Sequence, residues 1–425
     1  MQSRRTPNEK DKSKTASVHA AEQVDKCVYN ALHAVFIDEA FCAQALTKAL
    51  KGLNNIRQHP FVTSVFYGVL DKSVRFDKLI SSLCDRPPDK NTSVVLKIGF
   101  FYCLYADMPD YAAVSRTVEL AKKVGAFGGF VNAVLKKALI FTPKFESALE
   151  KFSYEYSTPE WLCKRLISDY GETKAASVLG AELPQKTHIR PIKGRISSED
   201  FESTAKNCEF TEYGCYCDKR TSDNFAPGTV AVQSVSSMRA VNAYVKGVAC
   251  GKVLDLCAAP GGKSVYLSEL GNYDITACDI YEHKLDLMRG YAKKYGAKIT
   301  VRLNDATVYN SEFDNAFDMV IADCPCSGTG TLRSKPDILL KRKPSDIVEL
   351  CKTQRAILDA AARYCKVGGI LCYSTCSVLR AENEDIGDAF LSSHENYRRV
   401  DRVKLLPDTD KCDGFYIERF ERCEL

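Results

Sequence analysis

The sequence predicts an α/β protein in which an all-helical segment precedes an open, mainly parallel sheet. Apolar residues recur at helix spacing between about residues 21 and 150, as Val114, Val118 and Ala121 illustrate. From about residue 230 onward, short apolar runs alternate with amphipathic helices, which is typical of a parallel sheet covered on both faces. A chain of 425 residues is also too long for one ordinary core, so two or three domains are expected.

The expected domain boundaries follow these changes of pattern. Residues 1–20 are rich in Lys, Arg, Ser and Thr, and we expect a disordered tail there. We expect an all-helical domain over 21–150 and a small α+β connecting subdomain over 151–232, where helix and strand signals are mixed. The α/β domain is expected over 233–425.

Within the α/β domain, the expected strands alternate with helices along the chain. The expected strands are 252–257, 275–279, 299–303, 318–323 and 369–374. The expected helices are 263–270, 281–295 and 345–365. Two late segments, 398–403 and 415–420, are expected to add antiparallel edge strands.

Composition limits the class of protein. The formal net charge of +5 permits an anionic partner such as nucleic acid without requiring one. Nineteen cysteines at irregular spacing, in a large chain without a visible signal peptide, predict a reducing cytoplasmic compartment rather than a disulfide framework. The longest apolar stretch, 98–106, is too short to span a bilayer, so no membrane association is expected.

Residues 253–264 are the most informative stretch, reading Val-Leu-Asp-Leu-Cys-Ala-Ala-Pro-Gly-Gly-Lys-Ser. They place a tight loop at the carboxyl end of a parallel strand, where open α/β sheets bind ligands, and the adjacent glycines let a ligand approach the backbone. A phosphate-binding P-loop would need glycine where Cys257 stands, and no G-x-G-x-x-G dinucleotide motif occurs. S-adenosylmethionine, a nucleoside-like cofactor without a triphosphate, fits this loop.

Three acidic residues follow neighbouring strands of the predicted sheet. Asp279 ends the second strand, Asp305 follows the third and Asp323 ends the fourth. Carboxyl ends of neighbouring strands converge on one crevice, so these side chains are expected to face a common nucleoside ligand. The alternative is that each acid only caps a local turn.

Two cysteines also lie at strand ends. Cys326 belongs to Asp-Cys-Pro-Cys-Ser-Gly-Thr-Gly over 323–330, and Cys376 belongs to Tyr-Ser-Thr-Cys-Ser over 373–377. A thiolate that adds to carbon 6 of a pyrimidine makes carbon 5 nucleophilic toward a sulfonium methyl group, which is covalent catalysis. Asp323 is placed to stabilise charge on the ring, and the target base must leave its stack.

A structural or metal-binding role is the alternative for these cysteines. Cys215 and Cys217, like Cys324 and Cys326, are one residue apart. No second C-x-x-C pair or histidine spacing completes a zinc site, so no metal is expected.

These motifs resemble those of the RNA cytosine-5 methyltransferases of the RsmB (Sun/Fmu) type over nearly the whole chain. The loop 255–263 resembles the methyl-donor loop of that family, 323–330 its Pro-Cys motif and 374–377 its second cysteine motif. Further matches are Arg333, Pro336-Asp337-Ile338, Gln354, Glu382-Asn383-Glu384 and Asp413-Gly414-Phe415. The resemblance implies a Rossmann-like methyltransferase domain that uses S-adenosylmethionine.

The resemblance also implies roles for individual residues. By it, Cys376 is the attacking nucleophile, Cys326 assists product release, and Asp323 completes the catalytic set. Sequence spacing alone leaves the roles of the two cysteines open. The implied cofactor contacts are Cys257, Ala258, Ala259, Pro260, Gly261, Gly262, Lys263, Asp279, Asp305 and Asp323.

The helical segment resembles the NusB-like RNA-binding fold. The matching pieces are Tyr67-Gly68, the helix 96–105, Pro109-x-Tyr111-x-Ala113-Val114, and Phe130-Val-Asn132-Ala-Val-Leu135. Within the family, this pairing implies a cytosine-C5 methyltransferase of 16S (small-subunit) ribosomal RNA, expected to be a monomer. The alternatives are a transfer RNA cytosine-C5 methyltransferase and a non-catalytic RNA-binding scaffold.

Overall fold

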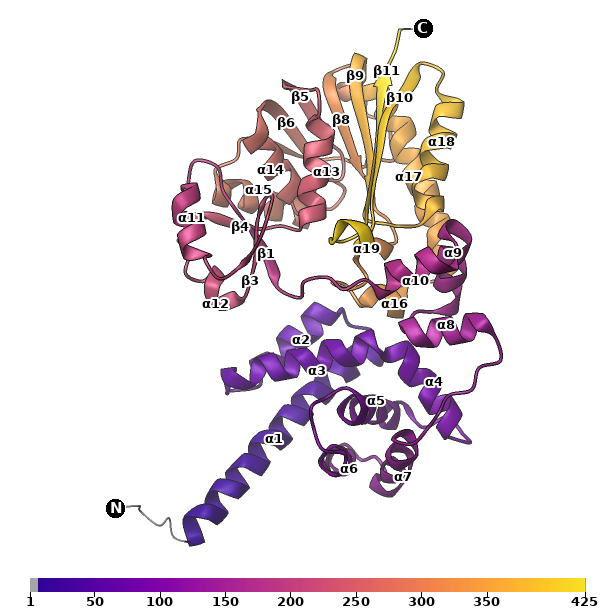
Figure 1. The fold of residues 1–425 in the computed structure, drawn as a ribbon. Helices are drawn as coiled ribbons and strands as arrows, with labels where there is room; N and C mark the ends of the chain where they lie inside the picture. Colours follow the sequence, from indigo (N-terminus) through magenta and orange to yellow (C-terminus); the bar gives the residue numbers. More distant parts are fainter. Residues whose placement is uncertain (1–6, 425) are drawn as a thin grey trace. The chain divides into compact units, whose positions relative to one another are not determined.

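The computed structural model describes residues 7–424, with side chains from residue 21 onward. The chain divides into two compact units, Met1–Lys164 and Arg165–Leu425, and each is described by itself (Figure 1). The boundaries expected at residues 150 and 232 stay predictions.

The first unit is helical throughout its described residues. Its helices are α1 (Pro7–Phe36), α2 (Cys42–Lys51), η1 (Ile56–Gln58), α3 (His59–Asp71), α4 (Ser73–Leu83), α5 (Lys90–Leu104), α6 (Asp110–Lys123), α7 (Gly128–Ala138) and α8 (Ala148–Tyr156). Helix α1 begins inside the segment expected to be a disordered tail, and residues 1–6 of that segment lie outside the described residues.

Helix α5 is the core of this unit. It is apolar on almost every side and contacts α1, α3, α4, α6 and α7. Gly99 permits this packing, because a Cβ atom there would lie 2.7 Å from the Thr117 side chain and 2.8 Å from that of Leu135. Tyr102 of α5 donates a 2.6 Å hydrogen bond to Asp25 of α1, so a polar contact also joins the two helices.

The second unit begins with a small mixed region. After α9 (Glu160–Tyr170), which crosses the boundary, and α10 (Glu172–Gly180), four short strands form an antiparallel sheet in the order β2-β3-β1-β4. The elements are β1 (Thr187–Pro191), α11 (Ser198–Thr204), β2 (Glu209–Thr211), β3 (Gly214–Cys217), α12 (Lys219–Ser222) and β4 (Val230–Val232).

A seven-stranded sheet forms the centre of the second unit, in the order β10-β11-β9-β8-β5-β6-β7. The strands are β5 (Cys250–Asp255), β6 (Asn272–Asp279), β7 (Ile299–Leu303), β8 (Phe317–Asp323), β9 (Cys365–Thr375), β10 (Tyr397–Leu405) and β11 (Phe415–Arg422). Strands β5 to β9 pair in parallel, and β11 and β10 extend the sheet in antiparallel fashion. The predicted α/β class and the late antiparallel strands are confirmed.

Helices cover both faces of this sheet (Figure 1). One buried cluster joins the sheet to α17 (Pro344–Tyr364) and α18 (Glu384–Ser393). A second cluster joins it to α13 (Val235–Val245), α14 (Gly262–Leu270) and α15 (Glu282–Tyr295). Short helices complete the unit: η2 (Ser311–Phe313), η3 (Thr329–Thr331), α16 (Asp337–Lys341), η4 (Arg380–Glu382) and α19 (Pro407–Asp410).

The strand order fixes where a ligand can bind. The chain runs outward from β5 through β6 to β7, then returns to β8 on the other side of β5. In open α/β sheets, ligands bind at such a switch point, outside the carboxyl ends of the strands. The loops that follow β5 and β8 therefore face the expected crevice. None of the helices in the described part of the chain combines the length and the apolar character that crossing a membrane demands.

Candidate active site

The loop after β5 is pinned to both neighbouring strands. The Leu256 amide donates to the Ile321 carbonyl of β8 at 2.9 Å, and the Ala258 amide donates to the Cys278 carbonyl of β6 at 2.8 Å. Gly261 has a φ of 102°, in the region that favours glycine. A Cβ atom at Gly262 would meet nothing within 4 Å, so open space lies beside the backbone there. Such a cradle fits a nucleoside-like cofactor.

Asp255, the last residue of β5, was not among the predicted cofactor contacts. Its side chain is buried, and its Oδ2 atom accepts a 2.6 Å hydrogen bond from the Ser264 hydroxyl. Its Oδ1 atom is buried with no hydrogen-bond partner among the described residues. Burial raises the pKa of this carboxyl to about 6. A buried acceptor without a donor fits a ligand that supplies one, such as the amino group of S-adenosylmethionine.

Asp279 and Asp305 lie at adjacent strand ends, as predicted. The Asn304 amide donates to the Asp279 carbonyl at 3.2 Å, which brings the two turns together. Each carboxylate also caps its own turn, since Asp279 accepts from the Tyr281 amide at 3.1 Å and Asp305 accepts from the Thr307 amide at 2.9 Å. The turn-capping role is therefore present, and it occupies the Oδ1 atom of each acid.

Asp323 connects the donor loop to the next strand. Its Oδ2 atom lies 2.8 Å from the Lys263 ammonium, at the start of α14. Its Oδ1 atom accepts a 2.9 Å hydrogen bond from the Ser374 hydroxyl of β9, which also contacts the buried Tyr244 hydroxyl at 2.6 Å. The Lys263 ammonium lies 5.3 Å from the centre of the Phe415 ring, a cation–π contact.

The two predicted cysteines meet at this edge of the sheet. The Sγ atoms of Cys326 and Cys376 lie 3.2 Å apart, although 50 residues separate them in the chain. The hydrogen bond with Cys326 lowers the pKa of the Cys376 thiol, and the charges of Lys335 and Lys263 lower it further. Burial and the negative charge of Asp323 oppose them. The same hydrogen bond and burial raise the pKa of the Cys326 thiol. The pKa values of the two thiols are therefore shifted in opposite directions, downward at Cys376 and upward at Cys326.

Backbone contacts hold the surrounding segments together. The Gly330 amide donates to the Cys376 carbonyl at 2.9 Å, and the Gly414 amide donates to the Gly330 carbonyl at 2.8 Å. A Cβ atom at Gly330 would lie 2.2 Å from the Gly414 carbonyl oxygen. Only glycine permits this close approach. These hydrogen bonds therefore hold the segments after β8, β9 and α19 against one another.

The Pro-Cys loop is also held from within the domain. The Arg342 guanidinium donates to the carbonyls of Cys326 and Ser327, each at 3.3 Å. On the inner side, the Ser327 amide donates to the Glu382 carboxylate at 2.7 Å. Sequence reasoning did not give Arg342 or Glu382 a part in the site, because neither contact is encoded by spacing along the chain.

One of the two cysteine pairs considered as metal ligands lies outside this site. Cys215 and Cys217 of β3 are buried in a small apolar cluster with Ile189 and Phe201. Within residues 21–424, whose side chains the structure describes, no group of three or more His, Cys, Asp or Glu side chains is arranged to hold a metal ion.

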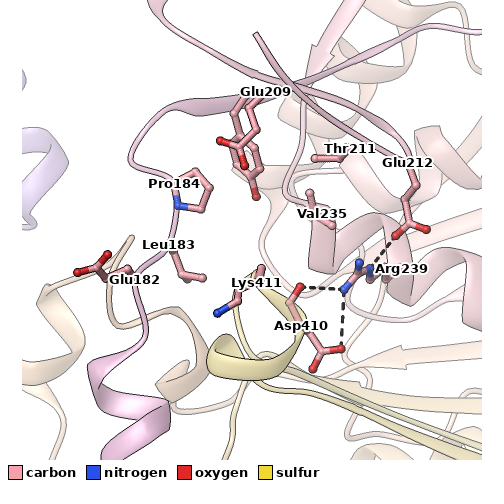
Figure 2. A pocket seen from close by; sticks show the side chains of 11 residues that line it. Glu182, Leu183, Pro184, Glu209, Thr211, Glu212, Val235, Arg239, Asp410 and Lys411 are labelled. Carbon is pink, nitrogen blue, oxygen red and sulfur yellow. Dashed lines mark hydrogen bonds and ion pairs between the residues drawn. The ribbon is translucent and has the colours of Figure 1, made fainter.

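A pocket elsewhere in the second unit is lined by none of the predicted site residues (Figure 2). It lies between the segment 182–184, the β2–β3 hairpin, the start of α13 and the end of α19. Its Arg239 is already engaged, because it donates to Glu212 at 2.8 Å and to the Asp410 carbonyl at 3.1 Å. The strand-end cluster is therefore the stronger candidate for the active site.

Comparison with known proteins places this site in a family. The family described as 16S rRNA methyltransferase RsmB/F matches residues 246–421, and the NusB family matches residues 22–139. Ribosomal RNA small subunit methyltransferase B of Xanthomonas campestris is 29% identical over 91% of this chain and 94% of its own length. The probable ribosomal RNA small subunit methyltransferase B of Bacillus subtilis is 30% identical over 84% of this chain and 89% of its own length.

Solved structures agree on the fold. The crystal structure of PH0851 is 22% identical, with a TM-score of 0.77 over 94% of this chain and 99% of that one. A methyltransferase homologue from Pyrococcus horikoshii is 24% identical, with a TM-score of 0.56 over 66% of this chain and 100% of that one. The predicted Rossmann-like methyltransferase domain, the NusB-like domain and the dependence on S-adenosylmethionine are confirmed. The chain belongs to the ribosomal RNA small subunit methyltransferase B family.

Proposed function

We propose that this enzyme methylates carbon 5 of a cytosine in small-subunit (16S) ribosomal RNA through a covalent adduct between Cys376 and the base. The observation that carries the proposal is the 3.2 Å approach of the Cys326 and Cys376 sulfur atoms at the carboxyl edge of the sheet. The Lys263–Asp323 ion pair lies beside them. The names of the relatives and the NusB-family domain support ribosomal RNA as the substrate.

The donor loop and the strand-end acids would hold the cofactor. Residues 257–263 would surround it, with Asp279 and Asp305 accepting from its hydroxyl and amino groups and Asp323 closing the site on the β8 side. Asp255 adds a buried acceptor that has no protein partner among the described residues. When bound there, S-adenosylmethionine supplies an electrophilic methyl group.

The Cys376 sulfur starts the reaction on a base that has left its stack. Its thiolate, favoured by Cys326, Lys335 and Lys263, attacks carbon 6 and forms the S–C6 bond. The electron pair of the C5–C6 double bond then becomes available at carbon 5. This carbon would take the methyl group, and the electron pair of the broken S–C bond would remain on the cofactor sulfur. A proton on ring nitrogen 3 would neutralise the negative charge that the addition delivers to the ring, and the Asp323 carboxylate would accept the hydrogen bond from that nitrogen.

Product release reverses the covalent step. The proton on carbon 5 is removed, its electron pair re-forms the C5–C6 double bond, and the Cys376 thiolate leaves. Cys326 assists here because its sulfur is in direct contact with the leaving sulfur. Cys326, whose raised pKa keeps it protonated, can donate its proton to the departing Cys376 sulfur, and the Cys326 thiolate that results can accept the proton from carbon 5.

Bisulfite sequencing of ribosomal and transfer RNA tests this proposal in cells that carry or lack the gene. We expect one or more cytosines of small-subunit ribosomal RNA to lose protection when the gene is absent. Cys376→Ala should not restore protection, whereas the matched Cys250→Ala, at an exposed cysteine that starts β5, should restore it. Full activity of Cys376→Ala would overturn the mechanism, and protection of transfer RNA alone would favour the alternative substrate.

A further inference from the structure

The most deeply buried acidic side chain beside the site belongs to Glu382, which the mechanism above does not use. Its exposed fraction is 0%. Within the part of the chain that the structure describes, it forms no ion pair, whereas the other acid with 0% exposure, Glu418, pairs with Arg399 and Arg402. A buried carboxylate without a cation is costly unless hydrogen bonds compensate it, so its donors indicate what it does.

Those donors come from both cysteine loops. The Oε1 atom of Glu382 accepts from the Ser327 amide at 2.7 Å, next to Cys326, and from the Gln354 side chain at 3.2 Å. The Oε2 atom accepts from the hydroxyls of Ser327 and Ser377, at 2.5 Å and 2.6 Å. Ser377 is the residue after Cys376. One carboxylate therefore joins the neighbours of both thiols.

The charges around the two thiols are unequal. On Cys376, the negative charge of Asp323 opposes the positive charges of Lys335 and Lys263, and Asp323 is itself paired with Lys263 at 2.8 Å. The negative charge of Glu382 acts on Cys326 and adds to the hydrogen bond and burial that raise the pKa of that thiol. Among the described residues, the negative charge of Glu382 acts on Cys326 itself, on Cys351 of α17 and on Tyr373 of β9, and each of these three groups is neutral when protonated.

We propose that Glu382 is a positioning residue that clamps the two cysteine loops together and keeps the shared proton of the thiol pair on Cys326. The contact between the sulfur atoms is compatible with either atom as the donor. The negative charge of Glu382 beside Cys326 opposes a thiolate at that position, so it favours the arrangement in which Cys326 donates to a Cys376 thiolate. The proposal rests on the proposed function for the role of Cys376, and it extends that function to a residue that contacts neither the base nor the cofactor.

Glu382→Gln separates the charge from the clamp. Glutamine has the same shape, and the serine hydroxyls can turn to donate to its oxygen or accept from its amide. The purified full-length enzyme, without RNA or cofactor, is treated with iodoacetamide at a series of pH values, and alkylation at positions 326 and 376 is quantified by peptide mass spectrometry. We expect the preference for Cys376 over Cys326 to fall by about tenfold, equivalent to about one unit of difference between the thiol pKa values.

Glu418→Gln is the matched control, because it also removes a buried carboxylate of the same unit but none of the bonds to the cysteine loops. Its alkylation preference is expected to equal that of the wild type. An unchanged preference in Glu382→Gln, or an equal loss in Glu418→Gln, overturns the proposal. Because this measurement needs no methyl transfer, its failure is distinguishable from a failure of the proposed function, which bisulfite sequencing of Cys376→Ala reports.

Ser377→Ala tests the clamp without removing the charge and serves if Glu382→Gln does not fold. It removes one hydrogen bond to the carboxylate, together with the 3.0 Å contacts of the same hydroxyl with the Leu379 amide and the Thr329 hydroxyl. We expect kcat for RNA methylation to fall about threefold to tenfold, with an unchanged KM for RNA, because the loss affects thiol placement rather than RNA binding. An unchanged kcat, or a loss confined to KM, overturns the clamp.

Discussion

The Lys263 ammonium lies 2.8 Å from the Asp323 carboxylate, and this contact joins the first turn of α14 to the end of β8. The two residues belong to different motifs, the donor loop and the Pro-Cys motif. Their ion pair therefore couples the cofactor side of the site to the thiol side. Lys263 also acts on the Cys376 thiol, whose pKa it helps to lower.

Lys263→Met is expected to slow methyl transfer most strongly at neutral pH. Methionine keeps the chain length but removes the charge, so the pKa of Cys376 rises and less thiolate is present. We expect a loss of about tenfold at pH 7, equivalent to about one pKa unit, and a smaller loss at pH 9. The rate of single-turnover methylation across this pH range measures the loss.

The control is Lys366→Met, which breaks the 2.6 Å pair with Asp318 at the opposite end of β8. It should change the rate less than about twofold. An equal loss at every pH would show that Lys263 does not act through the thiol.

Cys326→Ala is expected to accumulate a covalent protein–RNA adduct. The Cys376 sulfur still attacks carbon 6, but release slows because the adjacent thiol is missing. The adduct is measured as a slow band on a denaturing gel after incubation with ribosomal RNA and S-adenosylmethionine. The double variant Cys326→Ala/Cys376→Ala should give no such band, and an adduct that persists in it would assign the attack to another residue.

Gly330→Ala is expected to destabilise the second unit, because a Cβ atom there would lie 2.2 Å from the Gly414 carbonyl oxygen and the backbone must move. We expect a loss of about 1–3 kcal/mol in the free energy of unfolding, measured by urea denaturation. Gly290→Ala, on the exposed face of α15 with nothing within 4 Å, is the control and should be neutral or stabilising by up to about 1 kcal/mol. Equal stability of the two variants would contradict the close approach.

Asp255→Asn is expected to stabilise the enzyme without cofactor, in a pH-dependent way. Burial raises the pKa of Asp255 to about 6, so the folded state binds a proton more tightly than the unfolded state, whose aspartate pKa is about 3.9. The contribution of this carboxyl to stability therefore falls as the pH rises from about 4 to 6, and it stays lost above 6. Asparagine removes that loss, so the variant should exceed the wild type by about 1–3 kcal/mol at pH 7 and by little at pH 4.

The same substitution should weaken cofactor binding. Asp255 offers its buried Oδ1 atom to a donor from the ligand, and an asparagine amide would oppose that donor. Isothermal titration calorimetry with S-adenosylmethionine should show a Kd raised by at least about tenfold, equivalent to about 1.4 kcal/mol. A Kd that stays the same would mean that Asp255 serves the fold alone.

The sequence predicted the sheet well because its strands are buried apolar runs bounded by helices and turns. The expected ends of three strands, at residues 279, 303 and 323, coincide with the structure. Strand β9 begins at Cys365, four residues before the expected start. The pair Gly368-Gly369 has the pattern of a turn, but here it lies where the pairing of β8 and β9 shifts register, and Gly368 has a φ of 77°.

The sequence predicted the parts of the site that lie within short local motifs. The donor loop, the strand-end acids and the two cysteines follow from local patterns placed on a parallel sheet. The contacts of Glu382, Ser374 and Tyr244 do not, because each joins residues of different motifs or segments. An example is the 2.6 Å approach of the Tyr244 and Ser374 hydroxyls across 130 positions. Tyr244 lies on helix α13, and no sequence motif in that helix predicts its contact with Ser374.

Asp323 pairs with Ser374 near the ends of β8 and β9, so the register of these two strands determines the relative positions of the two reactive sulfur atoms. Cys326 follows the end of β8 by three residues, and Cys376 follows the end of β9 by one. Inserting one residue into either strand would therefore move one sulfur atom about 3.3 Å along the strand axis and place the following side chains on the opposite face of the sheet. Insertions and deletions should therefore be tolerated in the connections at the opposite edge of the sheet, whereas in these two strands they should abolish activity. Deep mutational scanning with single-residue insertions should show the loss of activity concentrated in β8 and β9, with smaller effects in the connections at the opposite edge of the sheet.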